Sequence, residues 1–131
     1  MATQISDIGI DVNDVRISIV PNSFEGDEGL GEQDVLVQSA GGGIVTQVFS
    51  NNVETNLGSF KFDMRATVAN LELIRGWKAN RNQNVVAAMA TTPDGNFKRT
   101  YQNAAIVNNY KIPVSADGVV SLEWKADAPT T

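Results

Sequence analysis

The sequence predicts a mainly β domain in which two packed antiparallel sheets, arranged as a sandwich or a barrel, are flanked by one α-helix at about 68–79. Three observations predict it: strand-like alternation of apolar and polar residues, turn residues between the alternating segments, and one segment with helical spacing. The chain has 131 residues, which is the size of one domain. We therefore expect a single domain over residues 1–131.

The alternation is clearest at residues 59–67 and 119–126. Successive side chains of a strand point to opposite faces, so each segment is expected to bury one face and expose the other. The residues predicted to be buried are Phe60, Phe62, Met64, Ala66, Val120, Leu122 and Trp124. Further strands are predicted over residues 14–20 (with Val15, Ile17 and Ile19 on one face), 34–38, 44–50, 85–91 and 97–107.

Turn residues separate these segments. Pro93-Asp94-Gly95-Asn96 combines the fixed φ of proline with a glycine that tolerates positive φ, as a hairpin turn requires. Asp117-Gly118 gives a second hairpin signal before the last strand. Gly41-Gly42-Gly43 indicates a flexible connection and lacks the spacing of a phosphate-binding loop.

Residues 68–79 change from a strand period to a helical one. Thr67 is placed to act as the N-cap, because its hydroxyl can accept from an unpaired first-turn N–H. The apolar stripe consists of Leu73, Ile74 and Trp77, with Leu71 at its margin. We expect this stripe to pack against a sheet.

The amino-acid composition excludes several common classes of catalytic group. The chain has no Cys and no His, so it lacks thiol nucleophiles, thiolate metal sites, the commonest general base and the commonest transition-metal ligand. Paired carboxylates are the remaining catalytic alternative, yet residues such as Asp63 and Glu123 fall on polar strand faces. We expect no enzymatic activity, no cofactor and no metal.

A cluster of carboxylates lies on glycine-rich backbone from Glu25 to Glu32. Such a segment suits Ca²⁺ in composition, but its spacing does not match an EF-hand loop, nor does that of Asp11-Val-Asn13-Asp14. A solvated or protein-contacting acidic loop is the favoured interpretation. The polar segment Asn51–Asn56 is likewise either an ordinary loop or a segment that orders against a neighbouring sheet edge.

Charge is divided unevenly along the chain, whose net charge is −5. Residues 1–58 hold nine acids and one base, whereas residues 59–131 hold six acids and nine bases. This division is either a chance feature of a solvated surface or a pair of complementary patches, which a head-to-tail assembly needs. The candidate contacts between stacked copies are Glu25, Asp27, Glu28, Glu32, Arg75, Lys78 and Arg81.

One family resembles this chain. Ser59-Phe-Lys-Phe-Asp-Met-Arg-Ala-Thr67, followed by Asn70-Leu-Glu-Leu-Ile74 opening a helix, is similar to phage tail tube proteins, above all those of contractile-tailed phages. Tyr101–Val107 and Asp117–Asp127 also resemble segments of that family. The resemblance covers about residues 10–128 and lies in the order and composition of segments.

The resemblance implies a small β-sandwich or barrel with one helix, a fold that type VI secretion tube proteins share. It implies hexameric rings that stack head to tail into a channel for genome ejection. The implied partners are other copies, sheath protein, tape-measure protein, baseplate and tail terminator, while DNA passes without specific binding. The implied location is the virion tail, after assembly in the host cytoplasm.

The alternative function is a monomeric β-sandwich module that binds carbohydrate or protein. A sugar platform needs exposed aromatic rings, whereas Trp77 and Trp124 fall on predicted core positions. No apolar run approaches the roughly 18 residues of a membrane-spanning helix. Residues 1–9 carry no base before an apolar stretch, so no secretory signal and no membrane association are expected.

Overall fold

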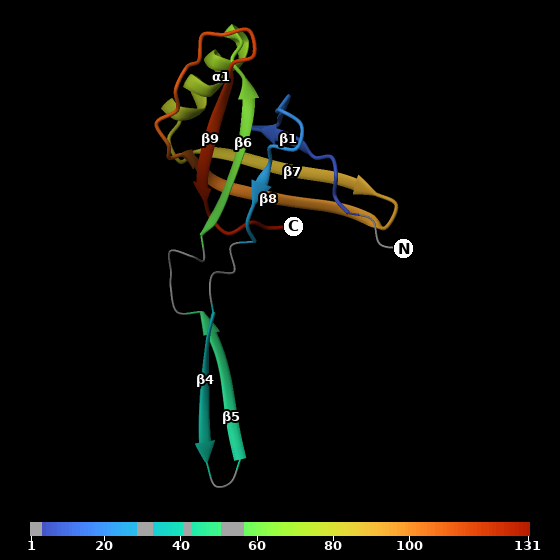
Figure 1. The fold of residues 1–131 in the computed structure, drawn as a ribbon, viewed down its shortest axis with the longest axis vertical. Helices are drawn as coiled ribbons and strands as arrows, with labels where there is room; N and C mark the ends of the chain where they lie inside the picture. The colour runs from blue at the N-terminus through green and yellow to red at the C-terminus, as the bar shows by residue number, and fades with distance from the viewer. Residues whose placement is uncertain (1–3, 29–32, 41–42, 51–56) are drawn as a thin grey trace.

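The computed structural model describes residues 4–28, 33–40, 43–50 and 57–131, the two short ranges by their backbone (Figure 1). The elements in chain order are β1 Gly9–Val12, β2 Val15–Ile17, β3 Glu25–Gly26, β4 Gln33–Ala40, β5 Gly43–Ser50, β6 Gly58–Arg65, α1 Val68–Ala79, β7 Asn84–Thr92, β8 Gly95–Ile106 and β9 Val119–Ala126. The predicted mainly β class, with one helix at 68–79, is confirmed.

Seven strands form one antiparallel sheet in the order β2-β1-β7-β8-β9-β6-β3, and β4 and β5 form a separate two-stranded sheet. The two packed sheets of the prediction are not confirmed, and the seven-stranded sheet is not closed. Strand β8 links its two halves, pairing with β7 and then, at Ala105 and Ile106, with β9. In Figure 1, β7 and β8 run across β6 and β9, so the sheet turns around its core.

Strands β6 and β9 pair along their full lengths, from Gly58↔Ala126 to Arg65↔Val119. The predicted apolar faces of both strands form the core, and only Ala66 of that set is partly buried. The fully packed residues are Phe60, Phe62, Met64, Val120, Leu122 and Trp124, each at most 3% exposed. Trp124 stacks on Phe60, with ring centroids 5.4 Å apart. Strand alternation therefore placed this part of the core correctly.

Helix α1 begins as predicted, with the Thr67 hydroxyl accepting a first-turn N–H at 3.2 Å. Ile74 and Trp77 are buried, but Leu73 is 41% exposed, which corrects the predicted stripe. Leu71 packs against the core instead. The helix faces the sheet through Ile74, so positions three residues to either side flank the contact and Leu73 falls outside it.

The strand predicted at 14–20 is shorter in the structure, where only β2, Val15–Ile17, forms within that range. Residues Asn13-Asp14 adopt positive φ (52° and 67°) and turn the chain between β1 and β2, as a tight hairpin requires. Ile17 is buried and Ile19 is partly buried, but Val15 is 57% exposed because it begins the edge strand β2. The sequence prediction missed β1 as a separate strand.

The weaker predicted strands appear as β4, β5, β7 and β8, with ends shifted by up to two residues. Pro93-Asp94 joins β7 to β8, and Gly95, at φ 149°, begins β8 opposite Thr92. Asp117-Gly118 turns the chain before β9, yet β8 and β9 are joined by a long connection instead of a tight hairpin. Gly41-Gly42 and Asn51–Asn56 lie outside the described residues.

A buried asparagine ties the helix to the sheet. Asn84 is 0% exposed, and its Nδ2 donates to the carbonyls of Trp77 (2.9 Å), Ala104 (3.1 Å) and Arg81 (3.1 Å). Its Oδ1 accepts from Asn13 Nδ2 at 3.2 Å. One side chain therefore joins the end of α1, β8 and the β1–β2 turn.

Candidate functional site

The β4–β5 hairpin is the first candidate assembly element. Its strands pair from Gln33↔Ser50 to Ala40↔Gly43, and in Figure 1 it stands away from the folded body. Among the described strands, none joins either outer edge of this two-stranded sheet. An isolated two-stranded hairpin is marginally stable in water, and unpaired strand edges accept further strands. The hairpin therefore offers backbone groups to another chain.

Asp27, just after β3, and Ser59, in β6, are joined by hydrogen bonds. Ser59 Oγ donates to Asp27 Oδ2 at 2.6 Å, and the Asp27 backbone N–H donates to Ser59 O at 2.9 Å. The Tyr101 hydroxyl donates to Asp27 O at 2.9 Å. Burial, with smaller effects from Asp27 and Glu28, raises the pKa of Tyr101 to about 12, so its hydroxyl stays a donor at neutral pH.

The predicted acidic contacts that the structure describes, Glu25, Asp27 and Glu28, lie in β3 or just after it, and the chain's own groups engage them. Glu25 pairs with Lys61 at 3.4 Å, and Glu28 with Arg99 Nε at 2.8 Å. The hydrogen bond to Glu28 raises the pKa of Arg99. Glu32 lies outside the described residues. Within the described ranges, no group of three or more acidic side chains is placed to hold a metal ion.

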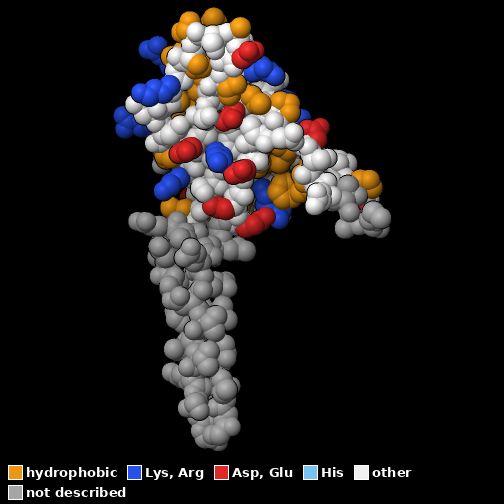
Figure 2. Space-filling view, in the orientation of Figure 1, with side chains coloured by type: hydrophobic (Ala, Val, Ile, Leu, Met, Phe, Trp, Pro, Cys, Tyr) orange, Lys and Arg blue, Asp and Glu red, His pale blue; other side chains and the backbone are white. Residues whose placement is uncertain are grey.

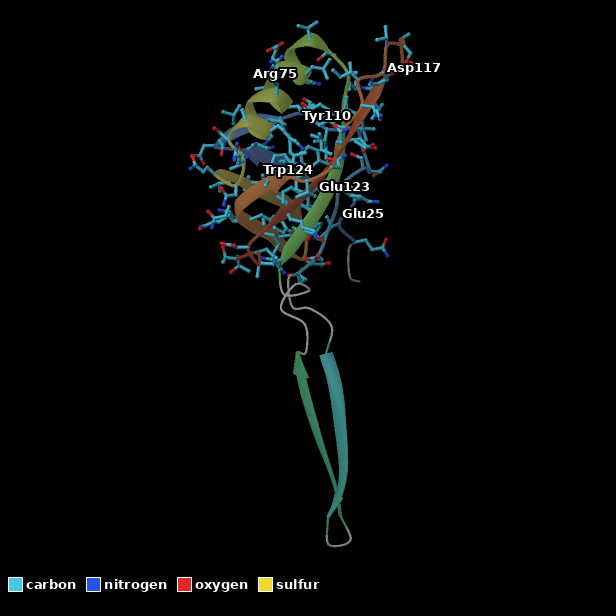
Figure 3. The ribbon with its side chains drawn as sticks, turned by 90° about the vertical axis from the view of Figure 1, so that its left-hand side faces the viewer. Glu25, Arg75, Tyr110, Asp117, Glu123 and Trp124 are labelled. Atoms are coloured by element: carbon cyan, nitrogen blue, oxygen red, sulfur yellow. The ribbon has the colours of Figure 1, made fainter. Side chains whose placement is uncertain are left out.

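The predicted basic contacts lie along α1 and just after it. Arg75 and Arg81 are exposed, whereas Lys78 Nζ donates to the carbonyls of Ile106 (3.1 Å) and Asn108 (2.8 Å) and ties the helix to the segment after β8. Figure 3 shows Arg75 and Glu25 on opposite sides of the body. The acidic and basic sets are thus apart within one chain, and their contact between copies stays a prediction.

An exposed apolar surface, which we call the apolar end, lies where α1 and β9 begin. The Ala66 N–H donates to Gly118 O at 3.0 Å and brings these two starts together. Figure 2 shows hydrophobic side chains at the top of the body, among others elsewhere on this face. Its members are Val68 (79% exposed), Ile112 (61%), Val114 (96%) and Val119 (37%). Sequence reasoning missed this surface, although Ile112-Pro113-Val114 between polar residues was a signal. Grouped exposed apolar residues mark interaction sites.

An open groove of about 970 Å³ lies between the N-terminal segment and the residues around β2. Its lining includes Ile5–Gly9, Arg16–Ile19 and Met89–Thr91. Arg16 is held there by an ion pair with Asp11. The volume is within the range of small-molecule sites, and the lining mixes apolar and polar groups.

No family model matches the sequence, and no curated protein matches it. Among solved structures, the chain matches a chain of the "Cryo-EM structure of the anti-feeding prophage (AFP) baseplate, 6-fold symmetrised". The TM-score is 0.54 at 13% sequence identity, and the match covers 99% of this chain and 96% of that one. The two chains share a fold. In the described residues, no helix is long and apolar enough to cross a membrane.

Proposed function

We propose that this chain is a structural subunit of a bacteriophage tail tube of the contractile type, forming hexameric rings that stack head to tail into a channel for genome ejection. The observation that carries the proposal is the fold shared over nearly the whole chain with a component of a six-fold prophage baseplate. The resemblance of residues 59–74 and 117–127 to tail tube proteins supports a tube subunit over other components.

Two surfaces of the described residues suit such an assembly. Head-to-tail stacking needs two different patches on each copy, because a closed two-fold contact would stop growth. The β4–β5 hairpin lies toward one end of the molecule and the starts of α1 and β9 toward the other (Figure 1). Strand addition at the hairpin edges would join copies through backbone hydrogen bonds.

The remaining partners follow from this role. A tube subunit contacts its own copies, a sheath protein, a tape-measure protein, a baseplate and a tail terminator. DNA would pass through without specific binding, because a net charge of −5 repels phosphate. The chain would reside in the virion tail after assembly in the host cytoplasm, and its role would be structural instead of enzymatic.

The groove supports a second candidate function, that of a monomeric binding module, because the volume of the groove suits a small ligand. Carbohydrate is the weaker ligand class for such a module. A sugar platform presents exposed aromatic rings, whereas Trp77 is 6% and Trp124 is 1% exposed.

Sedimentation velocity over a concentration series separates the two candidates. A tube subunit converts from 14.1 kDa monomers to hexamers and larger species as concentration rises. A chain that stays monomeric at every concentration, even when it is produced with its assembly partners, contradicts the tube role and leaves the binding module.

A further inference from the structure

We propose that the free end of the β7–β8 hairpin joins two copies of this chain edge to edge, with β7 of one copy pairing with β8 of the next. We define the ribbon tip as residues 90–97, where β7 ends and β8 begins. In Figure 1 both strands run on past the end of β1. The inference rests on the proposed function, because it names a contact between copies of the tube subunit.

The β7 edge of the ribbon tip is the one that faces β1. Strand β1 ends its pairing with β7 at Gly9↔Met89, and no described strand continues that pairing toward the tip. The Val85 carbonyl accepts from the Asn13 N–H at 2.8 Å, and the Val85 N–H donates to Asn13 Oδ1 at 2.9 Å. The backbone groups of Val85 therefore face this edge, and strand alternation turns those of Thr91 the same way.

The β8 edge of the ribbon tip lies on the other side. The Thr100 N–H donates to Thr130 O at 2.8 Å and the Thr130 N–H donates to Thr100 O at 3.0 Å, so the backbone groups of Thr100 face that side. The same alternation turns the backbone groups of Lys98 and Asn96 outward. The Lys98 carbonyl accepts from Arg99 Nη1 at 2.9 Å, whereas Asn96 has no such contact among the described residues.

The two edges complement each other. Thr91 and Asn96 are opposite each other in the β7–β8 register, so their outward groups lie at the same level on opposite edges. A second copy placed alongside brings its β8 edge to the β7 edge of the first, antiparallel as within the hairpin. Because the two edges differ, the contact is head to tail and leaves an edge for a third copy.

Charge and exposure favour a second copy as the occupant. The ribbon tip carries one charged side chain, that of Asp94 in the turn, so the meeting edges bring no like charges together. Thr91 and Asn96 are both exposed. Uncovered strand edges accept further strands, and a chain that has both edges supplies its own partner.

The alternative cover for the β7 edge is the N-terminal segment of the same chain. Residues 5–8 line the open groove together with Met89–Thr91, but they belong to no described strand. If this segment covered the edge, the Thr91 N–H would be protected in the monomer. Amide hydrogen exchange therefore separates the two occupants.

The exchange test compares the wild-type monomer with assembled protein. We expect the Thr91 and Asn96 amides of the monomer to exchange at least about 100-fold faster than that of Val86, which is buried on β7. In assembled protein, both amides should slow at least about tenfold. A Thr91 amide that is already protected in the monomer would overturn the proposal.

Proline substitution removes one outward N–H from each edge. These N–H groups lie outside the β7–β8 pairing, so Thr91→Pro and Asn96→Pro should keep the fold, which urea unfolding checks. We expect each to raise the protein concentration needed for assembly about tenfold. The matched controls Thr91→Val and Asn96→Thr keep the N–H and should assemble like wild type.

A mixture of the two proline variants tests the head-to-tail direction. The Thr91→Pro copy keeps its β8 edge and the Asn96→Pro copy keeps its β7 edge, so the two can pair but cannot extend the pair. At a concentration where each variant alone is monomeric, sedimentation velocity should show a two-copy species in the mixture. A mixture without that species would overturn the proposal.

The outcomes separate this contact from the tube role. Wild-type tubes, with proline variants that assemble equally well, would refute the ribbon contact while the tube role stands. Wild-type protein that forms short oligomers but never tubes, with the mixed pair still forming, would refute the tube role while the ribbon contact stands. Wild-type monomers at every concentration would overturn both.

Discussion

Replacing Asn84 by alanine should lower the free energy of unfolding more than replacing any surface residue does. The side chain is 0% exposed, and it donates to the buried carbonyls of Trp77 and Ala104. Asn84→Ala leaves both carbonyls without that donor. An unsatisfied buried group costs about 1–3 kcal/mol, so we expect a loss of about 3 kcal/mol in the free energy of unfolding. For a domain of this size, the melting temperature should fall by about 10 °C.

Urea unfolding followed by tryptophan fluorescence measures this loss, because both Trp77 and Trp124 are buried. Asn109→Ala is the matched control. Asn109 is exposed after β8, and its replacement should change the free energy by less than about 0.5 kcal/mol. A loss below about 1 kcal/mol for Asn84→Ala would refute the view that this side chain holds α1 to the sheet.

Three other perturbations test the apolar end, the titration of Tyr101 and the charge contacts between copies. Val114→Asp should raise the protein concentration needed for assembly at least about tenfold, because it puts a charge into the apolar end. The control Val15→Asp, on the edge strand β2, should leave that concentration unchanged. Equal effects of the two substitutions would show that the apolar end is not a contact between copies. The free energy of unfolding should decline as pH rises from about 10 to about 12, because the folded state holds Tyr101 protonated after the unfolded chain has released that proton. Tyr101→Phe should flatten this decline in urea titrations, and an unaltered decline would assign it to other groups. Assembly followed by pelleting should weaken between about 0.05 and 1 M salt if the acidic and basic sets meet across copies. Equal yields would remove that charge contact but not the tube.

Long, regular helices and strands were predictable, because burying one face of such an element repeats apolar residues at one spacing along its whole length. Strand β9 matches its prediction at both ends, and helix α1 does so at Val68 and Ala79. The core followed from the same pattern, since Phe62, Leu122 and their neighbours alternate with polar residues. Thr67 as the N-cap was also predictable, because capping is a local interaction.

Features that depend on contacts between distant residues were not predictable. Tyr101 bonds Asp27 across 74 positions, and no local pattern indicates that pairing. The strand β3 is two residues long and has no period to detect. Asn84 sits in a predicted strand, but its burial depends on carbonyls supplied by α1 and β8. The acidic residues were grouped from their closeness in the sequence, whereas the pairing of Glu25 with Lys61 and of Glu28 with Arg99 depends on contacts that only the fold shows, and their role between copies stays a prediction.

Negative-stain electron microscopy of the concentrated full chain tests the central claim most directly. We expect end-on views of six-fold rings with a central hole, and side views of tubes that lengthen by adding rings. Single small particles at every concentration, with or without assembly partners, would contradict the account.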